Sequence, residues 1–336
     1  MQSISEPSLD LILPFLEPIA DVILDPGVSE IMVNGNGTVF VERGNRMQSI
    51  EATVDRGMLE QAVKRIARPL GLDFGEHAPI LDATLPDSSR VSAIWPGCSV
   101  GGITLTIRKF ARNWFTLDQL VALGAMPPQV ADVLTTAVLN RRNILFSGGT
   151  STGKTTFAKA LLDKIPAEER IGVIEDTAEL QLCQPNIFRL VEGKEQRASD
   201  GTVISPPVTI RHLLKAALRN RPDRIVLGEM RAGEAYDLLG ALNSGHAGSI
   251  STIHANSPLE ALSKLLMLVL QAPEIGAISE RAIMAQIGSL IDLVVQLERR
   301  GGCRRIAHIE AIERFDYATR QYVTRRVYRA LRETAS

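Results

Sequence analysis

Alternating apolar and polar residues predict a small mixed domain in the first hundred positions. In SEIMVNGNGTVFVERG (residues 29–44), the alternation continues on both sides of a Gly-Asn-Gly turn, which predicts a β-hairpin. Residues 8–24 show near-helical spacing disturbed by Pro14 and Pro18, and helical spacing returns from Arg56 to Arg68. RVSAIWPGCSVGGITLTIRKF (residues 90–110) supplies two further strand candidates.

The pattern changes after a basic, aromatic junction at residues 108–115 (RKFARNWF). Short apolar strands then alternate with long amphipathic helices. Strands are expected at NILFSG (143–148), IGVIED (171–176) and DRIVLGE (223–229). Helices are expected from Thr155, at about residues 209–219 and after residue 229, with a polar loop at residues 192–207. Such alternation predicts an α/β domain with a largely parallel sheet. We therefore expect an α+β domain at residues 1–112 and an α/β domain at residues 113–336.

Composition narrows the class of protein without identifying it. The formal net charge is −1, so no overall basic field attracts nucleic acid or anionic lipid. The three cysteines are far apart and form no CxxC pair, so neither a zinc ribbon nor a disulfide framework is indicated. The acidic N-terminus does not resemble a secretory signal, and no window reaches about 18 apolar residues. We expect a soluble protein of a reducing cytosol.

The strongest chemical signal is the stretch GGTSTGKT at residues 148–155, which satisfies G-x-x-x-x-G-K-[ST]. A predicted strand precedes it and a predicted helix follows it, as a phosphate-binding loop requires. Glycines let backbone N–H groups point at an anion, and the following helix adds its positive end. Lys154 would bind the β- and γ-phosphates, and the Thr155 hydroxyl would ligate Mg²⁺. The alternative is a glycine-rich turn carrying an exposed loop lysine. The candidate nucleotide-binding residues are Gly148, Gly149, Thr150, Ser151, Thr152, Gly153, Lys154, Thr155 and Thr156.

Carboxylates follow two of the other predicted strands. Glu229 comes just past the strand of DRIVLGE, where it could hold Mg²⁺ through water or polarise an attacking water. Gly228 occupies the position at which an aspartate commonly stands. Glu175, Asp176 and Glu179 crowd the end of IGVIED, where a carboxylate could orient or deprotonate water. A surface glutamate and a solvated acidic turn are the respective alternatives.

Two histidines, His246 and His254, flank a Gly/Ser-rich run with a short strand-like centre. Metal ligation is disfavoured because no third ligand lies at helical spacing. A histidine that senses the γ-phosphate or hydrogen-bonds a carboxylate fits better, and a histidine satisfied within the core is the alternative.

These four elements, in this order, resemble the traffic ATPases of type II secretion, type IV secretion and pilus systems. That family has a RecA-like P-loop NTPase domain with a Walker A loop, an acidic Asp box, an atypical Walker B and a His box, behind a smaller α+β N-terminal domain. GSISTIHANSP and the N-terminal stretches quoted above carry the resemblance, which extends from about residue 10 to 315. The compact length and the junction at TIRKF favour conjugal transfer ATPases of the TrbB type.

The resemblance implies roles for particular residues. Glu175 would be the water-activating base and Glu229 the Walker B glutamate, which would also hold Mg²⁺ partly through water, although the two could exchange the role of base. His254 would be the His-box residue. Arg90 and Arg108 match N-terminal-domain arginines that reach the phosphates. Arg219 and Arg231 flank the Walker B element with less defined roles.

The resemblance also implies a hexameric ring that binds ATP and Mg²⁺ between its domains. Such a ring would be cytoplasmic and peripheral to the inner membrane through components of the secretion or conjugation apparatus. Direct nucleic-acid binding is not indicated. A tight-adherence pilus, type IV pilus or type II secretion ATPase is the nearest alternative, although the type II tetracysteine motif is missing. A nucleotide-gated scaffold with little turnover and a RecA-like nucleic-acid motor are the alternatives from other classes.

Overall fold

A computed structural model describes residues 9, 12–44, 46–110, 115–193, 196–197, 203–276 and 278–330. Contacts divide the chain into two compact units, Met1–Asn113 and Trp114–Ser336. The basic, aromatic junction falls partly on residues 111–114, which lie outside the described residues. Among the helices that the structure describes, none is long and apolar enough to cross a bilayer.

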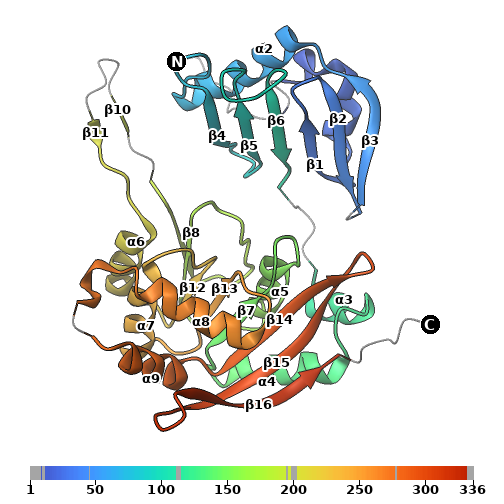
Figure 1. Cartoon of the computed structure of the whole chain (residues 1–336). Helices are drawn as coiled ribbons and strands as arrows, with labels where there is room; N and C mark the ends of the chain where they lie inside the picture. Colours follow the sequence, from blue (N-terminus) through green and yellow to red (C-terminus); the bar gives the residue numbers. More distant parts are fainter. Residues whose placement is uncertain are drawn as a thin grey trace. The chain divides into compact units, whose positions relative to one another are not determined.

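The first unit is built on a six-stranded sheet in the order β3-β2-β1-β6-β5-β4 (Figure 1). The predicted hairpin is confirmed: β1 and β2 pair antiparallel, and Gly37 turns between them at a φ of 84°, a value that favours glycine. The predicted helix is also confirmed as α2, which begins after an Asp55 cap and ends before Pro69. The strands are β1 (Val28–Val33), β2 (Thr38–Arg43), β3 (Arg46–Thr53), β4 (Ile80–Thr84), β5 (Arg90–Ile94) and β6 (Thr104–Arg108), and the helices are α1 (Ala20–Leu24) and α2 (Arg56–Ala67).

The proline-containing N-terminal segment does not form the single helix that its residue spacing suggested. It forms the 3₁₀ turns η2 (Leu13–Phe15) and η3 (Glu17–Ile19) before the short α1, and a proline stands in the first turn of each 3₁₀ element. A proline fits a first turn, where its missing N–H costs nothing, but it interrupts a longer helix. Another 3₁₀ turn, η4 (Arg68–Leu70), follows α2. Apolar residues of the segment still enter the unit's own core.

The second unit contains an eight-stranded sheet in the order β16-β15-β14-β7-β13-β12-β8-β9 (Figure 1). Six neighbouring strands of this sheet, β14, β7, β13, β12, β8 and β9, are parallel, as predicted. β15 and β16 add an antiparallel extension that was not predicted. The strands of the sheet are β7 (Ile144–Ser147), β8 (Ile171–Glu175), β9 (Ile187–Val191), β12 (Arg224–Leu227), β13 (Ile250–Ile253), β14 (Leu293–Arg300), β15 (Cys303–Asp316) and β16 (Gln321–Arg329).

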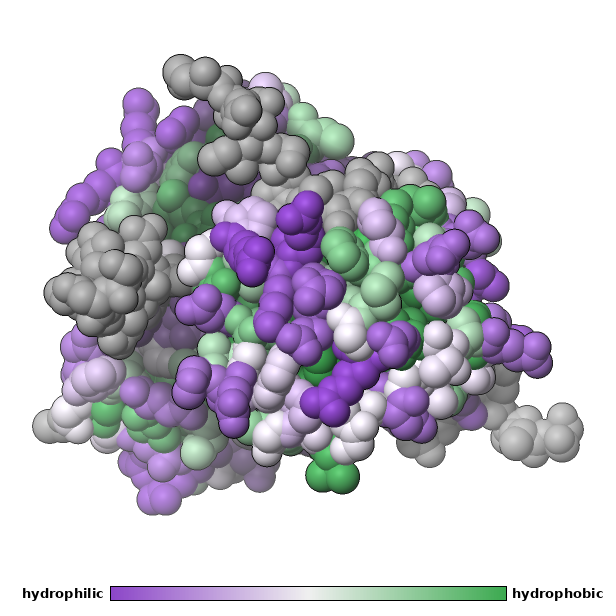
Figure 2. Space-filling view, turned by 90° about the horizontal axis from the view of Figure 1, so that it is seen from above, coloured by the Kyte–Doolittle hydropathy of each residue, from purple (hydrophilic) through white to green (hydrophobic). Residues whose placement is uncertain are grey.

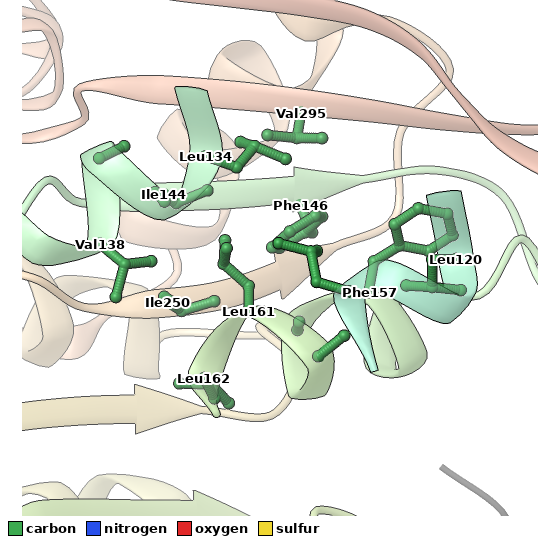
Figure 3. Close-up of a cluster of buried hydrophobic side chains, with 14 of the residues drawn as sticks. Leu120, Leu134, Val138, Ile144, Phe146, Phe157, Leu161, Leu162, Ile250 and Val295 are labelled. Atoms are coloured by element: carbon green, nitrogen blue, oxygen red, sulfur yellow. The ribbon is translucent and has the colours of Figure 1, made fainter. Parts of the chain in front are cut away.

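Helices cover both faces of this sheet and bury two hydrophobic clusters. Along β7, Ile144 and Phe146 enter one cluster and Leu145 enters the other, because successive side chains of a strand point to opposite faces. Figure 3 shows the first cluster, in which Phe157 and Leu161 of α5 meet Phe146. The first cluster holds α3 (Leu117–Ala122), α4 (Pro128–Leu139) and α5 (Lys154–Leu162), and the second holds α6 (Ile210–Ala217), α7 (Glu234–Asn243), α8 (Pro258–Val269) and α9 (Glu280–Leu290).

Shorter elements complete the second unit. The region predicted as a polar loop contains a small hairpin of β10 (Gln196–Arg197) and β11 (Val203–Ser205). The 3₁₀ turns η5 (Leu218–Asn220) and η6 (Pro273–Ile275) follow α6 and α8. On the face seen in Figure 2, hydrophobic residues are interspersed among hydrophilic ones, which is ordinary for a protein surface.

Candidate functional site

The sheet register brings the predicted site residues of the second unit to one edge. Ser147 at the end of β7 pairs with Ile253 of β13, and Leu227 of β12 pairs with Ser251 of β13 and Ile174 of β8. The segments that follow these strands therefore emerge side by side. In open α/β sheets, ligands bind at the carboxyl ends of the parallel strands.

The predicted phosphate loop connects β7 to α5. Gly153 precedes the helix at a φ of 93°, and Ser151 also has a positive φ of 58°. A methyl group on Gly148 would lie 2.5 Å from Thr152 Oγ1, so the first glycine of the loop is needed for close packing. The Thr152 hydroxyl donates to the carbonyl of Gly149 at 2.9 Å, which closes the loop on itself.

Lys154 is buried, with 7 % of its surface exposed, so the description of it as an exposed loop lysine is wrong. Its Nζ donates to the carbonyl oxygens of Gly148 at 3.1 Å and Gly149 at 3.0 Å. Burial lowers the pKa of Lys154, the charge of Glu229 opposes this, and Arg231 adds to it. The ammonium is thus held inside the loop by carbonyl groups that a phosphate could replace.

His254 connects the loop to Glu229. Its Nε2 lies 2.5 Å from Glu229 Oε1, and its Nδ1 lies 3.3 Å from Lys154 Nζ. A carboxylate can only accept a hydrogen bond and an ammonium can only donate one, so Nε2 carries the proton and Nδ1 is bare. Burial lowers the pKa of His254, Glu229 raises it, and Lys154, Arg231 and Lys264 lower it further, which agrees with a neutral ring.

Arg231 extends this network to the end of β8. Its Nη2 lies 2.6 Å from Glu229 Oε2, and its Nη1 lies 2.6 Å from Asp176 Oδ2. Burial opposes the charged form, but the hydrogen bond to Glu229 and the charges of Asp176 and Glu229 together raise the pKa of Arg231. The resemblance implied only a less defined role for Arg231; in the structure this residue joins the segments that follow β8 and β12.

Glu175 is buried at the end of β8, and both of its carboxylate oxygens have partners. Oε1 accepts from the N–H groups of Leu180 at 2.8 Å and Glu179 at 3.0 Å, and Oε2 lies 3.3 Å from Arg189 Nη2. Burial raises the pKa of Glu175, and the two backbone hydrogen bonds and Arg189 partly offset that rise. Sequence reasoning missed Arg189, because an irregular segment separates β8 from β9 and the pairing of the two strands is not visible in the sequence pattern.

Gly228 stands where an aspartate is common, and the structure gives a reason for the glycine. A methyl group at Gly228 would lie 3.1 Å from Cγ of Glu175. The side chain of Glu175 therefore occupies the space that a larger residue at Gly228 would need, which leaves Glu229 as the first carboxylate after β12.

The other predicted residues lie on other elements of the chain. His246 Nδ1 hydrogen-bonds the carbonyl of Ala241 at 3.2 Å. Arg219 lies in η5. Arg90 and Arg108 belong to the first unit, where they are cross-strand partners on β5 and β6 and Arg108 lies 3.5 Å from Glu30.

The donor set suits Mg²⁺ bound mainly through a nucleotide. Within the part of the chain that the structure describes, no three His, Cys, Asp or Glu side chains are grouped to hold a metal ion. Mg²⁺ is commonly held by one or two protein oxygens, phosphate oxygens and water. The Thr155 hydroxyl on α5 and the Glu229 carboxylate fit that description.

Comparison with known proteins gives a consistent result. The family described as "Type II/IV secretion system protein" matches residues 15–326. The chain is 35% identical to "Probable conjugal transfer protein TrbB" of Sinorhizobium fredii over 87% of this chain and 85% of that protein. It is 32% identical to "Type IV secretion system protein VirB11" of Bartonella henselae over 92% of this chain and 95% of that protein.

A solved structure, the Legionella pneumophila ATPase DotB, superposes with a TM-score of 0.61 at 16% identity, covering 95% of this chain and 84% of that chain. The expected fold class, a RecA-like P-loop NTPase domain with a smaller α+β N-terminal domain, is confirmed by this likeness.

Proposed function

The chain belongs to the type II/IV secretion system protein family, and from that premise we propose that it is the ATPase that energises a conjugative type IV secretion apparatus. One observation carries the proposal. Lys154, His254 and Glu229 form a continuous hydrogen-bonded chain across the mouth of a phosphate-binding loop.

That chain of contacts gives the protein a way to detect the γ-phosphate. A triphosphate in the loop would take the Lys154 ammonium from the carbonyls of Gly148 and Gly149. Lys154 would then release His254, whose other nitrogen holds Glu229. Glu229 and the Thr155 hydroxyl would hold Mg²⁺, which neutralises charge on the phosphates when bound.

Glu175 is the proposed base for the attacking water. Its raised pKa brings it closer to neutral pH, where a general base is most effective. Two backbone N–H groups occupy Oε1, whereas Arg189 is the one contact of Oε2 among the described residues, so a water that gives its proton to Glu175 would bind Oε2 beside Arg189. We therefore include Arg189 as a positioning residue of the site.

ATP binding would close the first unit onto the second, with Arg90 and Arg108 reaching the phosphates, and hydrolysis would release that closure. ATP shifts this equilibrium only by its difference in affinity between the closed and open states. In a homo-oligomeric ring, proposed as a hexamer, the repeated motion would drive pilus assembly or substrate transfer. The ring would work in the cytoplasm against inner-membrane components of the apparatus.

A nucleotide-gated scaffold with little turnover is the second candidate. The specific observation that favours it is the burial of Glu175, whose three hydrogen-bonding contacts are all with protein groups. A scaffold would bind ATP tightly without needing a base that water can reach.

The test compares conjugative transfer and ATP turnover in the same variants. A donor strain lacking this chain would be complemented with the wild-type protein, Glu229→Gln, Lys154→Ala, or Arg43→Gln as a control on an exposed ion pair of the first unit. We expect wild type and Arg43→Gln to restore transfer, and the two site variants to lose both transfer and turnover. Full transfer with Glu229→Gln at negligible turnover would favour the scaffold. If the site variants lose pili and ATP turnover while DNA transfer stays normal, a pilus ATPase would be favoured.

A further inference from the structure

The antiparallel pair of β14 and β15 lies beside β7, the strand that leads into the phosphate loop (Figure 1). β14 pairs with β7 only as far as Gln296, opposite Ser147, and then continues to Arg300. Its last residues therefore run past the end of β7, where the loop begins. A methyl group on Gly148 would lie 3.0 Å from the carbonyl oxygen of Leu297, so the loop packs directly against this strand.

The side chain of Arg304, on β15, lies against the phosphate loop. A methyl group on Gly153 would lie 3.3 Å from Cδ of Arg304 and 3.6 Å from Cδ2 of Phe157. The stem of Arg304 thus covers the glycine that precedes Lys154. Arg299, its cross-strand partner on β14, stands on the same face of the hairpin.

The positions of the other site residues decide which part of a nucleotide would meet Arg304. Lys154, His254 and Glu229 gather on the side of β7 that faces β13 and β12, which is the end proposed for the γ-phosphate. β14 lies on the opposite side of β7. A triphosphate extended through the loop must therefore direct its nucleoside towards β14 and β15.

We propose that Arg304 binds the nucleoside end of the nucleotide, with its guanidinium plane against the purine base. This inference rests on the proposed ATPase function and adds a residue that determines nucleotide affinity. A planar, weakly hydrated guanidinium stacks well on aromatic faces, and such a contact contributes to binding without recognising phosphate.

Arg305 provides a matched control on the same hairpin. Neighbouring residues of a strand point to opposite faces, and Arg305 binds Glu298 at 2.8 Å instead of covering the loop. Arg304→Gln and Arg305→Gln remove the same charge from nearly the same place. Any general electrostatic loss of anion binding should therefore be similar in the two variants.

The experiment measures calorimetric dissociation constants of the full-length chain for Mg²⁺-ADP and for Mg²⁺-tripolyphosphate, which lacks a nucleoside. Relative to Arg305→Gln, we expect Arg304→Gln to weaken ADP binding about tenfold and to leave tripolyphosphate binding unchanged within about twofold. Equal weakening for both ligands would overturn the assignment and make Arg304 a phosphate contact. No change for either ligand would also overturn it. A wild-type chain that binds neither ligand would reject the proposed ATPase function itself, a result distinct from any difference between the variants.

Discussion

At the scale of single residues, His254 carries the connection between phosphate loop and carboxylate. Its tautomer follows from its two neighbours, because Glu229 can only accept and Lys154 can only donate. A neutral ring can hydrogen-bond both Lys154 and Glu229, so a movement of Lys154 is transmitted to Glu229. A protonated ring would be repelled by the ammonium of Lys154. The ring should stay neutral below the pH at which an exposed histidine becomes charged.

Nuclear magnetic resonance of the imidazole nitrogens would test this state. The chain has five histidines, so the resonance missing in His254→Gln identifies His254. We expect the Nε2–H tautomer at pH 7 and a pKa below the usual 6.5. Glu229→Gln should lower that pKa further, because a stabilising negative charge is lost, and Lys154→Ala should raise it. A protonated His254 at pH 7 would contradict the proposed relay.

Arg189 should set the pH at which Glu175 becomes available as a base. Its positive charge lowers a pKa that burial has raised, so Arg189→Gln should raise the pKa of Glu175 further. The base is then protonated up to a higher pH, and the acid limb of the kcat–pH profile should move upward. Arg189→Lys keeps the charge and should move the limb much less. An unchanged limb in Arg189→Gln would remove Glu175 from the role of base.

At the scale of elements, the placement of β12 depends on a buried ion pair at the far end from Glu229. Arg224, the first residue of β12, is fully buried and binds both carboxylate oxygens of Glu169, at 2.7 and 2.8 Å. It also donates to the carbonyl of Val138 at 2.8 Å, which joins β12 to the end of α4.

Removing the arginine should therefore destabilise the second unit. Arg224→Met removes the bidentate partner of Glu169, leaves it, within the described part of the chain, only the longer contact with Arg141 at 3.4 Å, and should lower the free energy of unfolding by about 3–5 kcal/mol. Urea denaturation would measure the change. Arg325→Met, on an exposed pair with Glu313, should change it little. A loss below about 1 kcal/mol for Arg224→Met would mean that the pair is not what fixes β12.

The accuracy of sequence reasoning also varies by element. The hairpin of β1 and β2 and the strand–loop–helix around Lys154 were predicted because their signals are local and their glycines mark the turns. The antiparallel strands β15 and β16 were missed, since register shifts at Ile309/Glu310 and Ile312/Arg314 disturb the two-residue period. Many arginines also interrupt these strands.

The candidate site was predicted in the same uneven way. Residues that directly follow a strand, such as Glu229 and Glu175, could be expected at the sheet edge from topology. Arg189 and Arg304 could not, because they lie on β9 and β15 and reach the site only through the strand order of the folded sheet. The burial of Lys154 was missed because the loop folds its own carbonyl groups around the ammonium.

At the scale of the whole molecule, the two units have separate hydrophobic cores. Domains with their own cores can move relative to one another while each keeps its fold. The proposed mechanism uses this independence, since ATP must favour one arrangement and hydrolysis must release it. The arginines of the first unit are the groups that would link the units through the nucleotide.

Arg108 offers the clearest test of that link. It lies on β6, and its side chain is 52% exposed. Arg108→Gln should lower kcat by about 10³, as expected for an arginine that stabilises transition-state charge. Arg43→Gln, an exposed arginine of the same unit, is the control. Normal turnover in Arg108→Gln would confine catalysis to the second unit.

The most direct test of the central claim is ATP turnover across a dilution series of the full-length chain, with particle mass measured by light scattering on the same samples. We expect specific activity to rise with protein concentration in step with a ring-sized particle, because catalysis belongs to the assembled ring. Monomers that hydrolyse ATP at the full rate, or rings that never hydrolyse it, would contradict the account.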